Sequence, residues 1–135
     1  MRRRKLLSTN WPDGVDRKVY ATLDSTNAEA ARIAASLSSP TWLLALEQTA
    51  ARGRRGREWV NPKGNFAASL VMRPSGTLDT WARRSCVASL ALADTITDLT
   101  GRAEGIALKW PNDVLLNGGK LAGILLESSA TDLTI

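Results

Sequence analysis

Short apolar runs separated by turn-forming residues cover most of the chain and predict a series of β-strands. The run at residues 41–46 is continuous and of strand length, so we expect a strand that is buried on both faces. The pair Asn117-Gly118, followed by Gly119, is a strong hairpin signal between two of the later runs. The predicted strands are residues 19–23, 41–46, 65–72, 106–109, 114–116 and 121–126.

Two segments have helical character. An alanine-rich helix is expected at about residues 27–37, after a run of N-cap candidates and before Ser38-Ser39-Pro40. A longer helix is expected at residues 78–99, with Gly101 as its stop. Several strands, two helices and hairpin connections favour an α+β fold over a series of parallel βαβ units. The candidate core positions of the longer helix are Trp81, Val87, Leu90, Ala91 and Leu99.

Composition narrows the class of protein. The 135 residues, 44% hydrophobic and 23% charged, are typical of one globular domain. No apolar run approaches the roughly 20 residues of a membrane span, and the apolar stretch after the basic N-terminus ends at Leu7, so neither membrane insertion nor export is expected. The lone Cys86 fits a reducing compartment, and the cytoplasm is the default.

The charge and the missing histidine limit the chemistry. A net charge of +5 favours an anionic partner, without saying whether it is nucleic acid, a membrane surface or a phosphorylated small molecule. The chain has no histidine and one cysteine, which excludes histidine-based triads and most zinc sites. Chemistry must come from Lys, Arg, Asp, Glu, Asn, Ser, Thr and backbone groups.

The most basic segment, residues 50–58, is too rich in arginine and glycine for a helix or strand and is expected to be a loop. Guanidinium groups bind phosphate and carboxylate in a forked manner, and glycines let backbone N–H groups approach the same anion. Taken alone, the segment favours nucleic-acid phosphates over a nucleotide substrate. Its position between two predicted strands favours a site loop held on a scaffold.

Two further motifs carry polar groups. Lys109-Trp110-Pro111-Asn112-Asp113, followed by Lys120, offers two cations and an oxygen ligand suited to Mg²⁺, so a triphosphate with its metal fits here. The same Pro-Asn-Asp is ordinary turn chemistry, and alone that interpretation is favoured. Residues 24–27 are by themselves a helix cap, or else a helix start that binds a small polar or anionic group.

Together and in this order, the motifs resemble the biotin–protein ligase family. The similar stretches are "LDSTNAEA" at 23–30, "EQTAARGRRGREW" at 47–59, "NPKGNFAASLVMRP" at 61–74 and "LKWPNDVLLNGGKLAGILLE" at 108–127. The resemblance implies a catalytic domain with a mixed, largely antiparallel sheet and packed helices, like that of class II aminoacyl-tRNA synthetases. It implies adenylation of biotin by ATP with Mg²⁺, then transfer of biotin to a lysine of a biotin carboxyl carrier domain.

The resemblance also implies roles for individual residues. Lys120 and Arg54 are the implied catalytic cations, and Asp113 is the implied Mg²⁺ ligand. The implied biotin-binding residues are Ser25, Thr26, Asn27, Gln48, Arg52, Arg54, Arg55, Lys120 and Gly123. The implied ATP-binding residues are Arg55, Arg57, Trp59, Lys109, Asn112 and Asp113.

The chain departs from the family pattern in two ways. Ala51 stands where the loop usually has glycine, and we expect a modest effect on affinity. We also expect residues 1–135 to be the N-terminal portion of the catalytic domain, without its later part, the small β-barrel-like domain or the N-terminal DNA-binding domain, so no DNA binding is expected. The resemblance leaves open whether the chain is a homodimer. The alternatives are a lipoate-ligase-like adenylating enzyme and a basic nucleic-acid-binding module.

Overall fold

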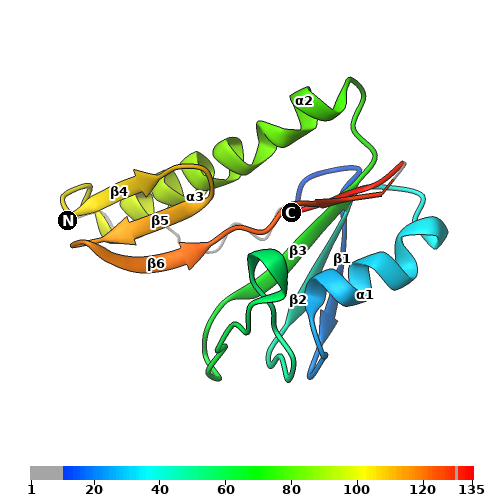
Figure 1. Cartoon of the computed structure of the whole chain (residues 1–135), viewed down its shortest axis with the longest axis horizontal. Coiled ribbons are helices and arrows are strands. Elements are labelled where there is room, and N and C mark those ends of the chain that lie inside the picture. Colours follow the sequence, from blue (N-terminus) through cyan, green and yellow to red (C-terminus); the bar gives the residue numbers. More distant parts are fainter. Residues whose placement is uncertain (1–10, 130) are drawn as a thin grey trace.

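The computed structural model describes residues 11–129 and 131–135 and contains two sheets and three helices in this part of the chain. Figure 1 shows β1, β2 and β3 with α1 on one side of the molecule, and β4, β5 and β6 beside α3 on the other. The elements are β1 (Asp16–Tyr20), α1 (Thr26–Ile33), β2 (Thr41–Ala45), β3 (Ala67–Met72), α2 (Leu78–Ala82), α3 (Arg84–Thr100), β4 (Ile106–Lys109), β5 (Asp113–Leu116), β6 (Gly119–Gly123), β7 (Glu127–Ser128) and β8 (Leu133–Thr134), with 3-10 turns at Ala34–Ser36 and Arg54–Gly56.

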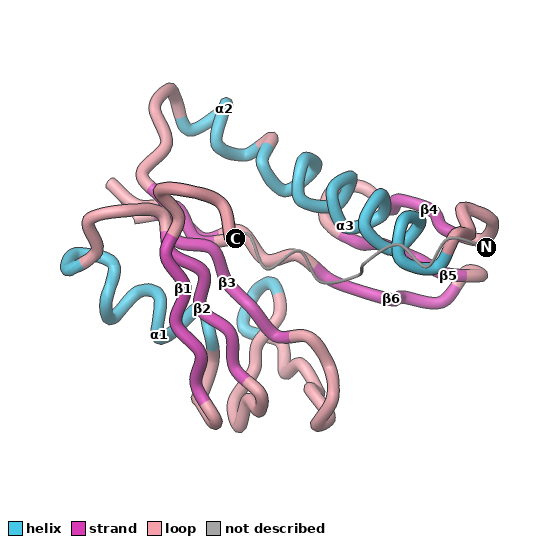
Figure 2. The backbone as a smooth tube through the Cα atoms, turned by 180° about the vertical axis from the view of Figure 1, so that it is seen from behind, coloured by secondary structure: helices cyan, strands magenta, loops and turns pink. Residues whose placement is uncertain are grey.

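The larger sheet is mixed and has the strand order β1-β2-β3-β8-β7. β1 and β2 are parallel and are joined through α1, whereas the other neighbours are antiparallel. Figure 2 shows β1, β2 and β3 side by side from behind. The expected α+β class with a largely antiparallel sheet is confirmed. The short strands β7 and β8 return the end of the described chain to β3.

The core lies between this sheet and α1. The inward positions of β2 and β3 alternate with half-buried ones, and Leu43 and Val71 pack against Ala30 and Ala34 of the helical segment. The expectation that residues 41–46 are buried on both faces is therefore only partly met, because the other face of β2 is half-buried. Alanine side chains let the helix approach the sheet closely, so few large residues are needed.

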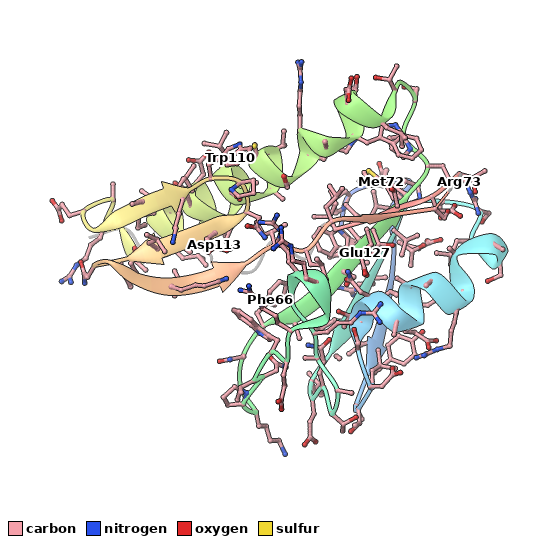
Figure 3. The ribbon with its side chains drawn as sticks, viewed as in Figure 1. Phe66, Met72, Arg73, Trp110, Asp113 and Glu127 are labelled. Carbon is pink, nitrogen blue, oxygen red and sulfur yellow. The ribbon has the colours of Figure 1, made fainter. Side chains whose placement is uncertain are left out.

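Arg73 closes the C-terminal end of the first helical segment. Its guanidinium group donates to the carbonyl oxygens of Ala34 at 2.6 Å and Leu37 at 2.7 Å, and its Nε lies 2.8 Å from Asp132. Carbonyls at the end of a helix lack intrahelical partners, so a cation satisfies them well. Arg73, the residue after β3, thereby ties the helix to the sheet and to the segment before β8 (Figure 3).

The smaller sheet is an antiparallel meander in the order β4-β5-β6. The predicted hairpin turn is confirmed: Asn117 and Gly118 have φ values of 50° and 80°, as a two-residue hairpin turn requires. Gly105 is also needed, because a Cβ there would lie 2.1 Å from Oδ1 of Asn117. The Asn117 N–H donates to the Gly105 carbonyl at 2.8 Å, which joins the residue before β4 to the turn after β5.

Several predicted boundaries shift. β1 covers residues 16–20 instead of 19–23, because its pairing with β2 begins where Asp16 bonds to Pro40. The strand predicted at 121–126 ends at Gly123, in β6, and residues 124–126 connect β6 to β7, which belongs to the other sheet. The long helix is interrupted at Arg83.

The predicted core face of the long helix is largely wrong. Trp81 is buried, but Val87, Leu90 and Leu99 are 62%, 52% and 55% exposed, and Ala91 is exposed too. The buried residues of α3 are Ser85 and Ser89. The small three-stranded sheet covers only one stripe of the helix, which is narrower than its apolar surface. None of the described helices has the length and apolar character needed to cross a bilayer.

The core assignment predicts that two leucines three positions apart contribute very differently to the free energy of unfolding. Leu43 is 0% exposed and Leu46 is 55% exposed. We expect Leu43→Ala to lower the free energy of unfolding by about 2–5 kcal/mol, because it removes buried methyl groups and leaves a cavity. The control Leu46→Ala should change it by less than about 1 kcal/mol. Urea denaturation measures both, and equal losses would contradict the assignment.

Candidate functional site

A cleft of about 1060 Å³ lies where the arginine-rich loop, the larger sheet, α3 and the smaller sheet approach one another. Phe66 and Met72 border it on the β3 side and Asp113 on the side of the smaller sheet (Figure 3). All the expected site residues but one line it: Ser25, Thr26, Asn27, Gln48, Arg52, Arg54, Arg55, Arg57, Trp59, Asn112, Asp113, Lys120 and Gly123. The exception is Lys109, which is exposed at the end of β4.

One end of the cleft is built by the start of α1. Ser25 is the N-cap, and its hydroxyl oxygen accepts from the Ala28 N–H at 3.4 Å. The Thr26 N–H donates to Oε1 of Gln48 at 2.8 Å. Ser25, Thr26 and Asn27 are all buried. The cap residues are therefore held at a helix start and also present polar groups to the cleft, so the cap and the site interpretations are compatible.

Two residues that the sequence motifs did not single out bond to this end without lining the cleft themselves. Ser69, in the middle of β3, is 1% exposed; its hydroxyl hydrogen-bonds Oδ1 of Asn27 and lies 2.8 Å from Oγ1 of Thr26. Glu127, at the start of β7, accepts from Nδ2 of Asn27 at 2.9 Å. The signal for Ser69 was a serine at an inward position of an otherwise apolar strand. No local signal marked Glu127, which lies 100 positions from Asn27.

The arginine-rich segment is a loop, as predicted. It closes on itself through a bridge between Arg52 and Glu58 and a 2.7 Å bond from the Gly53 N–H to the Arg57 carbonyl. Arg55 has a φ of 60°, in the left-handed region that is uncommon for residues other than glycine. The loop arginines are exposed. Arg52 reaches Glu127 at 3.5 Å, a long contact between exposed groups that contributes little stability.

Ala51, the position where the family pattern has glycine, is buried and lines the cleft. Its φ is not in the positive region, so the backbone here does not require glycine. Its carbonyl accepts from the Trp59 N–H at 3.0 Å, which joins the two ends of the loop.

The opposite wall gathers Lys120, Asp113, Trp59 and Gly123. The Lys120 ammonium lies 2.9 Å from Oδ1 of Asp113 and 4.9 Å from the centre of the Trp59 ring. The ion pair is close, but Asp113 Oδ1 makes no well-aligned hydrogen bond. A Cβ at Gly123 would lie 3.1 Å from Cε of Lys120 and 3.2 Å from its ammonium nitrogen, so glycine makes room for the lysine. This room lets one ammonium group contact a carboxylate and an aromatic face.

Asn112 holds this wall together. Its side-chain amide donates to the Ile124 carbonyl at 2.7 Å, and its main-chain carbonyl accepts from the Ile124 N–H at 2.9 Å. These bonds join the residue before β5 to the segment after β6. Among the described residues no group of three or more Asp, Glu, Cys or His side chains could hold a metal ion. Asp113 alone would serve a Mg²⁺ ion only if phosphate oxygens supplied other ligands.

Asp24 fixes the loop that leads into α1. Its carboxylate accepts from Arg32 at 2.7 and 3.0 Å and from the Ser25 N–H at 2.8 Å. These hydrogen bonds, first of all those from Arg32, lower the pKa of Asp24 well below its usual range, and the same pairing raises the pKa of Arg32. The Asp24 carbonyl accepts from the Ala50 N–H at 2.8 Å, so the ion pair also orders the start of the arginine loop.

Comparison with known proteins agrees with this arrangement. The model of the biotin/lipoate A/B protein ligase family matches residues 19–134, and the chain belongs to this family. It is 60% identical over 113 residues to the biotin--[acetyl-CoA-carboxylase] ligase of Paracoccus denitrificans, covering 84% of this chain and 47% of the relative. It is 35% identical over 117 residues to the bifunctional ligase/repressor BirA of Bacillus subtilis, covering 84% of this chain and 35% of that relative.

Two solved structures share the fold. The biotin protein ligase of Leishmania major in complex with biotin has a TM-score of 0.76 and 25% identity, over 92% of this chain and 55% of that one. The biotin protein ligase of Aquifex aeolicus in complex with biotin and ATP has a TM-score of 0.74 and 30% identity, over 88% of this chain and 49% of that one. The chain thus spans about half the length of these solved ligases and of the Paracoccus relative.

The Asp24–Arg32 pair predicts a defined response to acid. Because the pKa of Asp24 is lower in the folded than in the unfolded chain, its contribution to stability is complete above the unfolded value of about 4 and is lost as the pH falls through the lower folded value. We expect Arg32→Ala to raise the Asp24 pKa toward the ordinary value, as measured by NMR titration of the carboxyl carbon. An unchanged titration would refute the pairing, and Arg17→Ala, at an exposed position of β1, is the control.

Proposed function

We propose that this chain forms the substrate-binding part of an ATP-dependent ligase that adenylates biotin and transfers it to a lysine of a biotin carboxyl carrier domain. One observation carries the proposal: a single cleft joins a buried group of hydroxyl and amide side chains to a wall rich in cations. Membership of the biotin/lipoate ligase family supports it. So does the similarity to the Aquifex aeolicus ligase that binds biotin and ATP.

The buried end suits the cyclic urea of biotin. Gln48 uses its Oε1 to accept from the Thr26 N–H, so its Nε2 group, which has no partner among the described residues, is left to donate into the cleft. The Ser25 oxygen accepts from the Ala28 N–H, which leaves the hydroxyl proton for another acceptor. Both groups would bind the urea carbonyl. A buried hydrogen-bonding site of this kind selects strongly against a ligand that leaves it unpaired.

The cationic end suits a carboxylate beside a triphosphate. Both reacting partners are anions, so the protein must offset their repulsion and align them. Lys120 is our candidate to bind the biotin carboxylate and the α-phosphate. Arg54 is our candidate to retain the biotinyl-adenylate intermediate in the cleft. Arg52 and Arg55 would cover biotin, with Arg55 also near the nucleotide. The nucleotide side would be formed by Arg57, Trp59, Asn112 and Asp113. Asn112 would act there chiefly through its hydrogen bonds to Ile124, which join the strands of this wall.

The proposed chemistry needs no histidine. A carboxylate oxygen of biotin attacks the α-phosphorus, the bond to pyrophosphate breaks, and biotinyl-adenylate forms. The amine of the carrier lysine then attacks the acyl carbon, the bond to AMP breaks, and the amine loses a proton as the amide forms. Mg²⁺ would arrive with the triphosphate and neutralise its charge, with Asp113 as its one carboxylate contact. The lone Cys86 fits the reducing conditions of the cytoplasm.

The direct test is product formation. Incubated with biotin, ATP and Mg²⁺, the chain should yield biotinyl-adenylate and pyrophosphate, detected by mass spectrometry and a coupled pyrophosphate assay. Lipoate in place of biotin should yield much less adenylate, because its ring has no urea to pair with Ser25 and Gln48. Adenylation of lipoate in preference to biotin would refute the substrate assignment. Failure to bind biotin or ATP would refute the proposal as a whole.

The role of Lys120 is separately testable. We expect Lys120→Ala to lower the rate of adenylate formation by about 10²–10³-fold, since it removes the ammonium that offsets charge at the reacting atoms. Lys63, exposed in the turn before β3 and outside the cleft lining, offers the matched control Lys63→Ala. Wild-type adenylation by Lys120→Ala would show that another cation acts at this step.

A further inference from the structure

We propose that Arg84 is a further substrate-binding residue, which holds the β- and γ-phosphates of ATP on the side of the cleft formed by α3. The inference rests on the proposed function and deepens it, because it gives the leaving pyrophosphate a binding group of its own. Arg84 is the first residue of α3, and its side chain lines the cleft. It lies outside all the stretches that carry the family resemblance.

The guanidinium group of Arg84 is incompletely paired within the described part of the chain. Its Nε is buried and has no hydrogen-bond partner among the described residues. Arg84 also takes part in none of the ion pairs between these residues. A buried N–H without an acceptor is costly, and a partly buried charge without an opposite charge adds to that cost. The group is therefore suited to an anion that enters the cleft.

The helix face that carries Arg84 is otherwise uncharged. The α3 residues that line the cleft recur at intervals of three or four positions on one face and are Arg84, Val87, Ala88, Ala91, Leu92 and Thr95. Apolar neighbours keep the local dielectric low, so the attraction between a guanidinium group and an anion is stronger here than on the exposed arginine loop. An anion that contacts this wall therefore has Arg84 as its partner.

The first turn of α3 lies against the wall that we assign to the nucleotide. The Cys86 sulfur lies 4.0 Å from the Pro111 carbonyl oxygen, in the segment that leads into β5. Arg54 of the loop reaches the same region, because it lines a small second pocket together with Ser85 and Pro111. Guanidinium groups from the loop and from α3 therefore both border the nucleotide side of the cleft.

The geometry of the proposed reaction requires cations on two sides of the α-phosphorus. In an in-line displacement the leaving oxygen departs opposite the attacking oxygen. Lys120, our candidate beside the biotin carboxylate, belongs to the attacking side, where Asp113 and Trp59 contact it. The pyrophosphate leaves on the other side and carries most of the charge of the nucleotide. A guanidinium fork held on a helix can bind two of its oxygens at once.

The test is isothermal titration of the full chain with two ligands that share the adenylate phosphate and differ in the pyrophosphate group. ATP with Mg²⁺ carries the β- and γ-phosphates, and biotinyl-adenylate has neither. Arg84→Met should weaken ATP binding by about tenfold to a hundredfold, the effect of losing a charged hydrogen bond, and leave biotinyl-adenylate binding within about twofold of wild type. Equal weakening for both ligands, or unchanged ATP binding, overturns the inference.

The matched control is Arg83→Met, which removes the same charge from the neighbouring position. Arg83 is exposed and lies outside the cleft lining, so binding of both ligands should stay within about twofold of wild type. A loss of ATP binding in this variant as large as in Arg84→Met would show that net charge alone sets the affinity, and it would overturn the inference.

Thermal unfolding separates a ligand-binding role from a structural one. Because the Arg84 Nε has no acceptor among the described residues, Arg84→Met should leave the melting temperature of the ligand-free chain unchanged or raise it. A lower melting temperature, or failure to fold, would show that the guanidinium group supports the fold and would overturn the inference. If wild type binds neither ligand, the proposed function fails. If it binds both and Arg84→Met binds them equally well, only this inference fails.

Discussion

The close packing of α1 on the larger sheet is the interaction on which the site depends. The faces that meet carry alanines on the helical side and Leu43 and Val71 on the strands, so the helix axis lies near the sheet. At that separation the first residues of the helix reach across to Gln48 and Ser69. A larger residue at Ala30, which is fully buried, would push the helix away and break these contacts together. The apolar core and the polar end of the cleft are therefore parts of one packing arrangement.

The two ends of the cleft are built by different physical means. The buried end is ordered by hydrogen bonds between groups that come mostly from separate elements. The cationic end is built from an exposed loop and a three-stranded meander, where Lys120 is held by one carboxylate and one indole ring. A site of this composition combines directional recognition at one end with less directional charge neutralisation at the other. An uncharged, hydrogen-bonding group and an anionic reacting group in the same ligand require this combination.

Local patterns predicted the elements that depend on local interactions. The hairpin of β5 and β6 follows from Asn117-Gly118, and the start of α1 follows from its cap residues. Of the site residues that the sequence motifs named, all but Lys109 line the cleft. They missed Glu127 and Ser69, because a carboxylate in a two-residue strand and a serine in a buried strand become part of the site only through tertiary pairing. They misplaced the core face of α3, since helical periodicity shows which residues share a face and does not show how much of that face another element covers.

The exposed arginine loop has a consequence for the kinetics of ligand capture. Its guanidinium groups project from a protein with a net charge of +5, and only Arg52 has a carboxylate partner across the cleft among the described residues. Such a field attracts an anion before any contact is made and raises the frequency of productive encounters. At physiological ionic strength charges are screened over about 8 Å, so the attraction acts mainly when the anion is already within about that distance of the loop. Added salt should therefore slow the association of an anionic ligand more than it speeds its departure, because the groups that hold the bound ligand are better shielded from the ions than the loop that draws it in.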